Sequence, residues 1–458
     1  MRLLLSSCLL GLTGLLPVAT SASEPQTSVQ TGLSASNRLP PLTRRDVLSI
    51  QEEKLFLAGE PFAEISFNKY DLVWQLYDQV SQGHALNSAN PSLQAQDKAL
   101  RNLHELGFKT IRIFALPWGP AGPAAYADPE KRKNLYAALD KGVELCENND
   151  IRVVWSLSAG SFTDTKLDPS KGWVFGEEQE RELISNPESR GRRLLYRYID
   201  ETVQRYRERK AVLMWEISNE VTLLADIGDA NRVYNGERMP TLQDVARFFD
   251  DVARRIKNAD PLRLVNSGGS NMRESQWHLY KGQGWKTDTF EDQFQCFQLL
   301  YAHSTVDVLD IHSYPDNHPG YAITGHDGEK TWLDSKGYMT IARRLHKPLM
   351  IGELGLHAVP KTDKTVWEET PAYFESYSDA KAAKPWMLKA LNNVIEAGVP
   401  LSYWWCYQSD DSGEQRNPQR FDIERDRNPE LVACIVEANK RLKAKLQTQT
   451  AAPNARRH

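Results

Sequence analysis

Short apolar runs alternate along the chain with longer segments in which apolar residues recur at helical spacing. The short runs are continuously apolar rather than alternately apolar and polar, which is typical of parallel strands that are covered on both faces. Turn-forming residues bound most of them. The predicted strands are 63–68, 110–115, 151–157, 212–219, 263–267, 306–313, 348–354 and 399–406.

A helical pattern follows each predicted strand. In one of them Val245, Phe248, Val252 and Ile256 fall on a single face, and Thr241 is placed to cap the first turn. The predicted helices are 92–106, 130–148, 187–208, 242–258, 290–304, 332–346, 381–397 and 429–446.

Eight strand–helix units in succession predict an α/β fold, the (β/α)8 TIM barrel, as a single catalytic domain over 48–446 with long loops after its strands. An open doubly wound sheet is the alternative fold. Such sheets usually carry a glycine-rich turn after the first strand, whereas this chain continues with Phe67-Asn68-Lys69-Tyr70. Because the chain contains neither GxGxxG nor a P-loop motif, we expect no nucleotide cofactor.

The turns from helix to strand are short and the loops from strand to helix are long, and in barrels the latter usually carry the binding function. The long loops are 158–186, 221–240, 268–289, 314–331, 355–380 and 407–428. Aromatic residues gather in or beside them. Loop packing would explain each one singly, but as a group they indicate a cleft with platforms for sugar rings. They are Trp118, Trp173, Trp277, Trp285, Trp332, Trp367 and Tyr373.

The first 22 residues predict a secretory signal peptide. Arg2 precedes the apolar stretch 3–18, and the small residues of 19–22 suit cleavage. A membrane anchor is the alternative, but the stretch is shorter than the roughly 20 residues that a span needs. We therefore expect export to the periplasm or the extracellular medium, without stable membrane insertion.

The segments 23–47 and 447–458 are rich in small and polar residues, so we expect a flexible leader and a disordered tail. The net charge of -4 provides no basic footprint for nucleic acid, and we expect a monomer. The cysteines of the mature chain are far apart, which argues against a zinc site and leaves open one disulfide or isolated buried thiols. They are Cys146, Cys296, Cys406 and Cys434.

Two carboxylates stand at the ends of predicted strands. Glu220 follows the fourth strand, and Glu353 lies in the seventh. An ionisable residue that ends an apolar strand is costly to bury unless it is paired or used. Because these two strands face each other across a barrel, both carboxylates can converge on one bound bond. Other strand ends carry Arg112, His312, Tyr314, Trp404 and Trp405.

The ordered set resembles the cellulase and mannanase family of retaining glycosidases, glycoside hydrolase family 5 of clan A, over about residues 50–446. The motifs that carry the resemblance are Asn219-Glu220 after a Trp-Glu-Ile strand, Ile-Gly-Glu353-Leu-Gly, His312-Ser-Tyr314 and the late tryptophan pair. The resemblance implies that Glu220 is the general acid/base and Glu353 the nucleophile.

The resemblance also implies roles for the surrounding residues. Asn219 would hold the 2-hydroxyl of the sugar, and His312 and Tyr314 would order the site, with Tyr314 hydrogen-bonded to the nucleophile. Arg112 would lie beneath Glu353 and help to keep it ionised.

Trp405 would form the floor of the subsite in which the sugar reacts, and Trp404 fits this role less well. Trp118 and Asn68 stand at other strand ends and are candidates for substrate binding. The chain departs from the family pattern at 155–158, where family members often place a histidine, so part of the surrounding shell and the subfamily stay open.

Cleavage of an acetal needs one protonated carboxyl group, which assists the leaving oxygen, and one ionised carboxylate, which attacks the anomeric carbon. We expect the cation of Arg112 to lower the pKa of one carboxyl group and partial burial to raise that of the other. Glu216 is a competing candidate four residues before Glu220, and we interpret it as a buried structural carboxylate.

The sequence therefore predicts a retaining hydrolase of β-1,4-linked polysaccharide, either mannan or a cellulose-type glucan, that acts by double displacement and needs no metal or cofactor. An exo-acting β-glycosidase on oligosaccharides is the nearest alternative, with the loop 355–380 as the wall that would close the groove. A non-catalytic carbohydrate-binding barrel is another, but a binder has no need of both carboxylates. A metallohydrolase usually needs a His-x-His motif on the first strand, which this chain lacks.

Overall fold

A computed structural model describes residues 42–117, 121–158, 182–226, 233–234, 237–238, 240–314, 321–356, 380–407 and 422–451. All of them belong to one compact unit.

Eight parallel strands form the centre of this unit, in the order β10-β7-β6-β5-β4-β15-β14-β11. A parallel bridge from Asn266 to Val308 joins the two ends of this order, so the sheet closes on itself. The predicted (β/α)8 TIM barrel is confirmed. The strands are β4 (Glu64–Asn68), β5 (Thr110–Phe114), β6 (Arg152–Ser156), β7 (Val212–Glu216), β10 (Val265–Asn266), β11 (Leu309–Ser313), β14 (Leu349–Leu354) and β15 (Leu401–Trp404).

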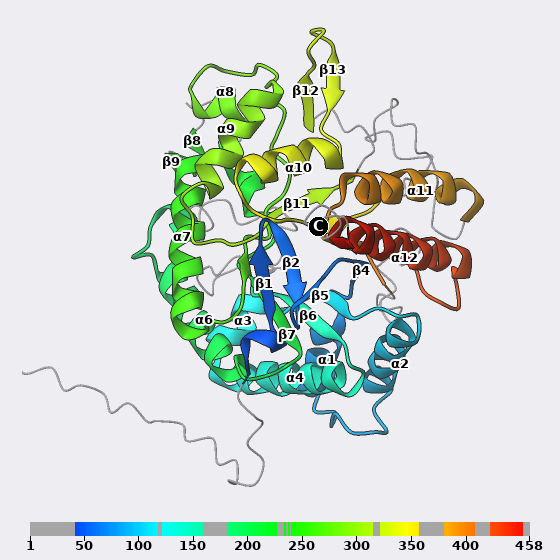
Figure 1. Ribbon diagram of the computed structural model, residues 1–458. Coiled ribbons are helices and arrows are strands. Elements are labelled where there is room, and N and C mark those ends of the chain that lie inside the picture. The colour runs from blue at the N-terminus through cyan, green and yellow to red at the C-terminus, as the bar shows by residue number, and fades with distance from the viewer. Residues whose placement is uncertain are drawn as a thin grey trace, which may run out of the picture. The chain divides into compact units, whose positions relative to one another are not determined.

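Helices surround the strands (Figure 1). In α7 the expected apolar face is buried, and Thr241 and Asp244 cap each other's backbone N–H groups as the sequence predicts. The main helices are α1 (Leu72–Ser81), α2 (Pro91–Glu105), α4 (Pro129–Asn148), α6 (Arg190–Tyr206), α7 (Leu242–Ala259), α9 (Phe290–Tyr301), α10 (Ser335–Arg344), α11 (Ala380–Ala397) and α12 (Pro429–Ala451).

Two features of the N-terminal part were missed by sequence reasoning. Helix α1 precedes the helix expected after the first strand, and its apolar face packs mainly on α4. Before the barrel, β1 (Leu48–Gln51), β2 (Lys54–Leu57) and β3 (Glu60–Pro61) form an antiparallel sheet. It was missed because its strands are short and half exposed, so they show no continuous apolar run.

The small sheet closes the N-terminal end of the barrel. Leu48 and Leu55 are buried in one cluster with Met214, Met350 and Leu401, which project from the barrel strands. In Figure 1, β1 and β2 lie in front of the strands and inside the ring of helices. Any substrate must therefore reach the barrel from its opposite, C-terminal end.

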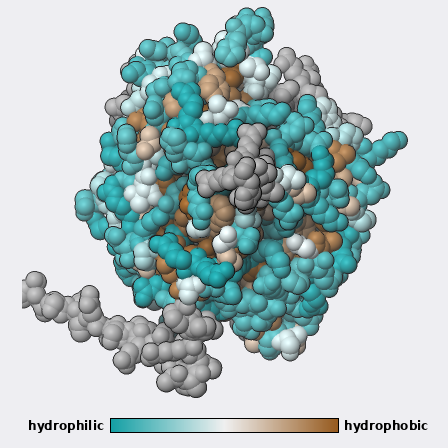
Figure 2. Space-filling view, viewed as in Figure 1, coloured by the Kyte–Doolittle hydropathy of each residue, from teal (hydrophilic) through white to brown (hydrophobic). Residues whose placement is uncertain are grey.

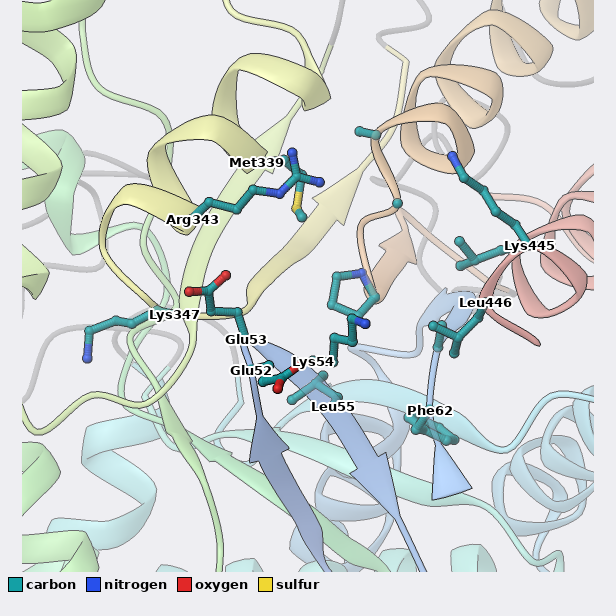
Figure 3. Close-up of a pocket in the computed structure, with 15 residues that line it drawn as sticks. Glu52, Glu53, Lys54, Leu55, Phe62, Met339, Arg343, Lys347, Lys445 and Leu446 are labelled. Carbon is teal, nitrogen blue, oxygen red and sulfur yellow. The ribbon is translucent and has the colours of Figure 1, made fainter. Parts of the chain in front are cut away.

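A pocket lies beside this sheet, between α10, α12 and the turn from β1 to β2 (Figure 3). Phe62, Ala63 and Pro400 line it, and they precede barrel strands rather than follow them. The pocket is thus at the N-terminal end, away from Glu220 and Glu353, and we assign it no part in the chemistry.

Two predicted boundaries are wrong. The leader was drawn too long, because Thr43 and Asp46 close a 3-10 turn over Arg44–Asp46 and Val47 is buried. The tail was also drawn too long, because α12 continues to Ala451 instead of ending at 446. The predicted signal peptide and the rest of the tail lie outside the described residues.

Several small elements are built from the long loops. The hairpin of β12 and β13 is joined to the preceding loop by a bridge between Thr324 and Thr289. These elements are α3 (Ala121–Ala127), η4 (Val221–Leu224), β8 (Val233–Tyr234), β9 (Glu237–Arg238), α8 (Gln276–Tyr280), β12 (Ala322–Thr324) and β13 (Lys330–Trp332).

The surface of the described part is largely hydrophilic on the face in Figure 2. Trp285 and Leu388 are the large hydrophobic residues that are exposed among those described. Within the same ranges, no helix combines the length and the apolarity that crossing a bilayer requires. Cys146, Cys296 and Cys434 are free thiols, and all three are buried, as is Cys406.

Candidate active site

The two candidate catalytic carboxylates meet at the C-terminal end of the barrel. Glu353 is the fifth residue of β14, and Glu220 follows β7 by four residues. An oxygen of each, together with a ring nitrogen of His312, lies within a group whose atoms are at most 4.8 Å apart. Glu353 is 5% exposed and Glu220 half-buried, so one carboxylate lies deeper than the other.

The position of Glu220 depends on a tight approach of two loops. Its backbone is left-handed, with φ 57°, and its N–H donates to the carbonyl of Gly268 at 2.7 Å. Gly268 itself has φ +65°, and a Cβ there would collide with the carbonyl oxygen of Ser218. Gly268 therefore allows the loops after β7 and β10 to come together and fixes the backbone of Glu220.

Arg112 connects the buried polar groups beneath the site. Its guanidinium donates to Glu216 through Nη2 at 2.7 Å, to the Oε1 of Glu353 through Nη1 at 3.2 Å, and to the Oδ1 of Asn219 at 2.7 Å. Glu216 is fully buried, as the sequence interpretation held. One cation thus holds both a structural carboxylate and Glu353, and the fixed fork of arginine defines their geometry.

The second oxygen of Glu353 accepts a hydrogen bond from the Tyr314 hydroxyl at 2.7 Å. The Tyr314 ring reaches this position because residue 355 is glycine: a Cβ there would lie 2.7 Å from the ring. Burial raises the pKa of Glu353, and Glu220 adds to this effect, while His312, Arg112 and Tyr314 oppose it. The charges of His312 and Arg112 and the hydrogen bonds from Arg112 and Tyr314 stabilise the ionised form.

His312 lies between the two carboxylates. Its Nδ1 is 2.9 Å from the Oε1 of Glu220 and 3.6 Å from the Oε1 of Glu353. Burial lowers the pKa of His312, but the two carboxylates outweigh burial and raise it to about 9. Burial in turn raises the pKa of Glu220, but the hydrogen bond and charge of His312 outweigh it and the net shift is downward.

These directions are the opposite of those expected from the sequence, in which the cation of Arg112 lowered the pKa of one carboxyl group and burial raised that of the other. At Glu353 burial outweighs Arg112 and raises the pKa, and at Glu220 the contact with His312 outweighs burial and lowers it.

We predict that Tyr314→Phe lowers kcat about 10- to 100-fold and moves the acidic limb of the kcat/KM profile to higher pH. The ionised form of Glu353 loses one hydrogen-bond donor, so its pKa rises and more acid-side activity is lost. The pH profile on a soluble substrate checks this. An acidic limb that stays in place would show that Tyr314 does not stabilise the Glu353 carboxylate.

The aromatic residues at the end of β15 separate into two classes. Trp404 is fully buried, whereas Trp405 is partly exposed. The Trp405 ring stacks on Tyr70, with centroids 5.0 Å apart, and lies 6.0 Å from the Phe114 ring. Of the two, Trp405 is the one that can present a ring to a ligand.

Asn68 lies beneath the site, where its side chain bonds only to other parts of the barrel. It is buried, its amide donates to the carbonyls of Gly352 and Tyr403, and its Oδ1 accepts from Arg112 at 2.9 Å. All its hydrogen-bonding groups are used within the barrel, so direct binding of substrate by Asn68 is not supported.

The aromatic residues predicted for the loops are only partly described. Trp277 and Trp332 are half-buried, and Trp285 is 60% exposed. The others, which lie outside the described residues, are Trp118, Trp173, Trp367 and Tyr373.

Sequence reasoning missed Tyr70 and Ser270. Tyr70 supports Trp405, and its position two residues after the first barrel strand is the sequence signal that could have indicated this role. Ser270 contributes a hydrogen bond that lowers the pKa of Glu220, and it lies three residues after the predicted fifth strand, 263–267.

Two groups of side chains in the described ranges have spacing that a metal ion could use. One is Glu220, His312 and Glu353, whose facing atoms already bond to each other, to Arg112 and to Tyr314. The other centres on Asp288, which accepts from His278 and from Gln293. A metal ion would have to displace these bonds.

Comparison with known families agrees with this geometry. The sequence model of cellulases, glycosyl hydrolase family 5, matches residues 78–405, which include both carboxylates and most of the barrel. The chain belongs to this family. It is an O-glycosyl hydrolase, as the sequence resemblance implied.

Proteins described as mannosidases or mannanases are among the similar ones. A probable mannan endo-1,4-beta-mannosidase C of Aspergillus terreus is 30% identical over 124 residues, which span 27% of that protein and 26% of this chain. The family 5 mannosidase of Rhizomucor miehei has TM-score 0.59 at 16% identity, covering 89% of this chain and 100% of that one. The endo-beta-1,4-mannanase of Thermotoga petrophila has TM-score 0.54 at 17% identity, covering 83% and 77%.

Proposed function

We propose that the protein is a retaining endo-β-1,4-mannanase that acts by double displacement, with Glu353 as the nucleophile and Glu220 as the general acid/base. The approach of the two carboxylates to within 4.8 Å carries this proposal. Retaining enzymes hold these groups about 5 to 5.5 Å apart, whereas inverting enzymes leave a wider gap of about 6.5 to 9.5 Å for a water.

The first step joins Glu353 to the sugar. Arg112 and Tyr314 orient its two oxygens, and one of them attacks the anomeric carbon while the glycosidic bond breaks. Glu220 gives its proton to the leaving oxygen. That proton comes across the 2.9 Å hydrogen bond from His312, and the negative charge that Glu353 loses on attack makes this transfer easier.

The second step releases the sugar. Glu220, now ionised, takes a proton from water, and the water oxygen attacks the anomeric carbon as the bond to Glu353 breaks. Asn219 is placed to help in both steps. Arg112 holds its Oδ1, which leaves the amide N–H groups to donate to a sugar hydroxyl.

We choose mannan over cellulose-type glucan as the substrate because the similar proteins are described as mannosidases or mannanases. A reducing-sugar screen on mannan, glucomannan, xylan and soluble cellulose tests this choice. We expect the highest rate on mannan and a lower one on glucomannan. Faster release from soluble cellulose would replace the mannanase assignment by that of a glucanase.

We predict that the viscosity of a soluble mannan falls early, while few reducing ends have formed. Internal cleavage shortens chains fastest, and partly exposed rings such as Trp405, Trp277 and Trp332 suit a groove that holds several sugar units. Viscometry with parallel end-group counting checks this. Early mannose or mannobiose at almost constant viscosity would instead indicate an exo-acting glycosidase with a closed pocket.

We propose further that the enzyme is exported and acts as a monomer. Export is supported by the sequence of residues 1–22. A monomer is supported by the scarcity of exposed large hydrophobic side chains in the described ranges. Edman sequencing of the exported protein and sedimentation equilibrium test the two points.

A further inference from the structure

Arg273, in the loop after β10, is a half-buried arginine without an acidic partner among the described residues. Its Nε is buried and has no hydrogen-bond partner in the same ranges. The carboxylate next to it in the chain, Glu274, pairs instead with Lys330 at 3.7 Å. Because it is costly to take part of a guanidinium out of water without an acceptor, this position indicates that a ligand supplies one.

The ring of Tyr321 holds the guanidinium of Arg273. The Cζ of Arg273 lies over this ring, 5.4 Å from its centroid, which is within the range of a cation–π contact. Tyr321 belongs to the loop after β11 and directly precedes β12, so the contact joins two neighbouring loops at the C-terminal end of the barrel. It fixes the plane of the guanidinium, whose terminal NH2 groups form no hydrogen bond within the described part of the chain.

The segment before Arg273 starts beside the candidate acid/base. Ser270 contributes a hydrogen bond to Glu220. From there burial alternates, because Ser270 and Met272 are buried whereas Asn271 and Arg273 are only half-buried. Three residues span at most about 11 Å, so the long side chain of Arg273 stays within reach of a sugar that adjoins the cleaved bond.

The order of the strands indicates on which side of the cleaved bond Arg273 lies. In the closed ring of eight strands, β10 is opposite β4, and β11 is opposite β5. The stacked rings of Tyr70 and Trp405 come from the ends of β4 and β15. Since Trp405 is the candidate floor for the sugar that becomes bonded to Glu353, the leaving sugar extends to the opposite side, toward β10 and β11.

We propose that Arg273, held by Tyr321, binds the leaving sugar by donating hydrogen bonds to its hydroxyl groups. The sugar then provides the acceptors that the described protein groups do not, and its glycosidic oxygen is held next to Glu220. In the second step the same contact can receive a sugar in place of water, so Arg273 also favours transfer of the bound sugar to another sugar. The inference rests on the proposed function, from which it takes the role of Glu353.

Arg273→Ala tests this binding role. On mannan we expect KM to rise about fivefold or more, while kcat falls less than about threefold, because hydrogen bonds from a charged donor to the substrate are lost. A dinitrophenyl mannoside carries no sugar on the leaving side, so its kcat/KM should fall less than about twofold. Steady-state kinetics on both substrates measure this difference, and circular dichroism verifies the fold.

Transfer to an added sugar separates binding from a structural role. With the dinitrophenyl mannoside as donor and mannotriose as acceptor, the mannosyl–enzyme divides between water and acceptor. Arg273→Ala should need about fivefold or more mannotriose for the same share of transfer product. Arg273→Lys keeps the charge but loses the flat fork, so it should fall between the two, and it replaces the alanine variant if that one does not fold.

Arg255→Ala is the matched control. Arg255 also lies over a tyrosine ring, 4.4 Å from the centroid of Tyr196, but it pairs with Asp200 between the outer helices α6 and α7. Its substitution should change neither readout.

Two results would overturn the role of Arg273. One is an equal loss on mannan and on the dinitrophenyl mannoside, and the other is an unchanged requirement for mannotriose. Failure of the proposed function is recognised separately, because the unsubstituted protein would then not hydrolyse mannan.

Discussion

Glu353→Ala is expected to abolish turnover of mannan while the chain stays folded. The nucleophile forms the bond to the anomeric carbon, and its loss should cost about three or more orders of magnitude in kcat. Because Glu353 is buried with Arg112, its removal leaves a cation without one of its two carboxylates. Glu216 remains to pair with that cation, so we expect a folded variant, as circular dichroism and thermal unfolding can verify.

Added azide distinguishes the loss of a nucleophile from other causes of inactivity. In Glu353→Ala the small anion can enter the vacated space next to Tyr314 and attack an activated aryl mannoside, which yields a product of inverted configuration. Glu353→Gln fills the same space, so azide should not restore its activity. Residual mannan hydrolysis above about 1% in either variant would remove Glu353 from the nucleophile role.

The barrel and the carboxylates at the ends of its strands could be predicted from the sequence because each depends on a local pattern of residues. Continuously apolar runs predict buried parallel strands, and a carboxylate that ends such a run is costly unless it is used. That reasoning placed Glu220 and Glu353 on facing strands and set Glu216 aside as structural.

What sequence reasoning missed depends on contacts between distant segments. The left-handed backbone of Glu220 exists because Gly268 permits the approach of Ser218. Asn68 turns inward because Arg112 and two carbonyls use all its polar atoms.

The protonation order of the site has the same origin. A sequence shows that His312 and Glu220 are near the ends of their strands, but only the fold brings them to 2.9 Å, where the ring can hold the proton.

Loss of Glu220 should separate substrates by their leaving groups. On mannan, whose leaving sugar needs a proton, we expect Glu220→Ala to lower kcat/KM about 10³-fold or more. On a dinitrophenyl mannoside, whose leaving group departs without a proton, the first step should be largely preserved, and the mannosyl–enzyme should accumulate because no base activates water. Added azide should then speed turnover and give a product of retained configuration.

The pH profile provides the independent check. The basic limb of kcat/KM reports loss of the proton shared by His312 and Glu220, so with the dinitrophenyl substrate it should disappear in Glu220→Ala. Tyr314→Phe serves as the matched control. It removes a hydrogen bond from the other carboxylate, Glu353, and should lower kcat/KM on both substrates by a similar factor. Equal losses on mannan and on the activated substrate in Glu220→Ala would exclude an acid/base role, and the proton held by His312 would then have to serve another group.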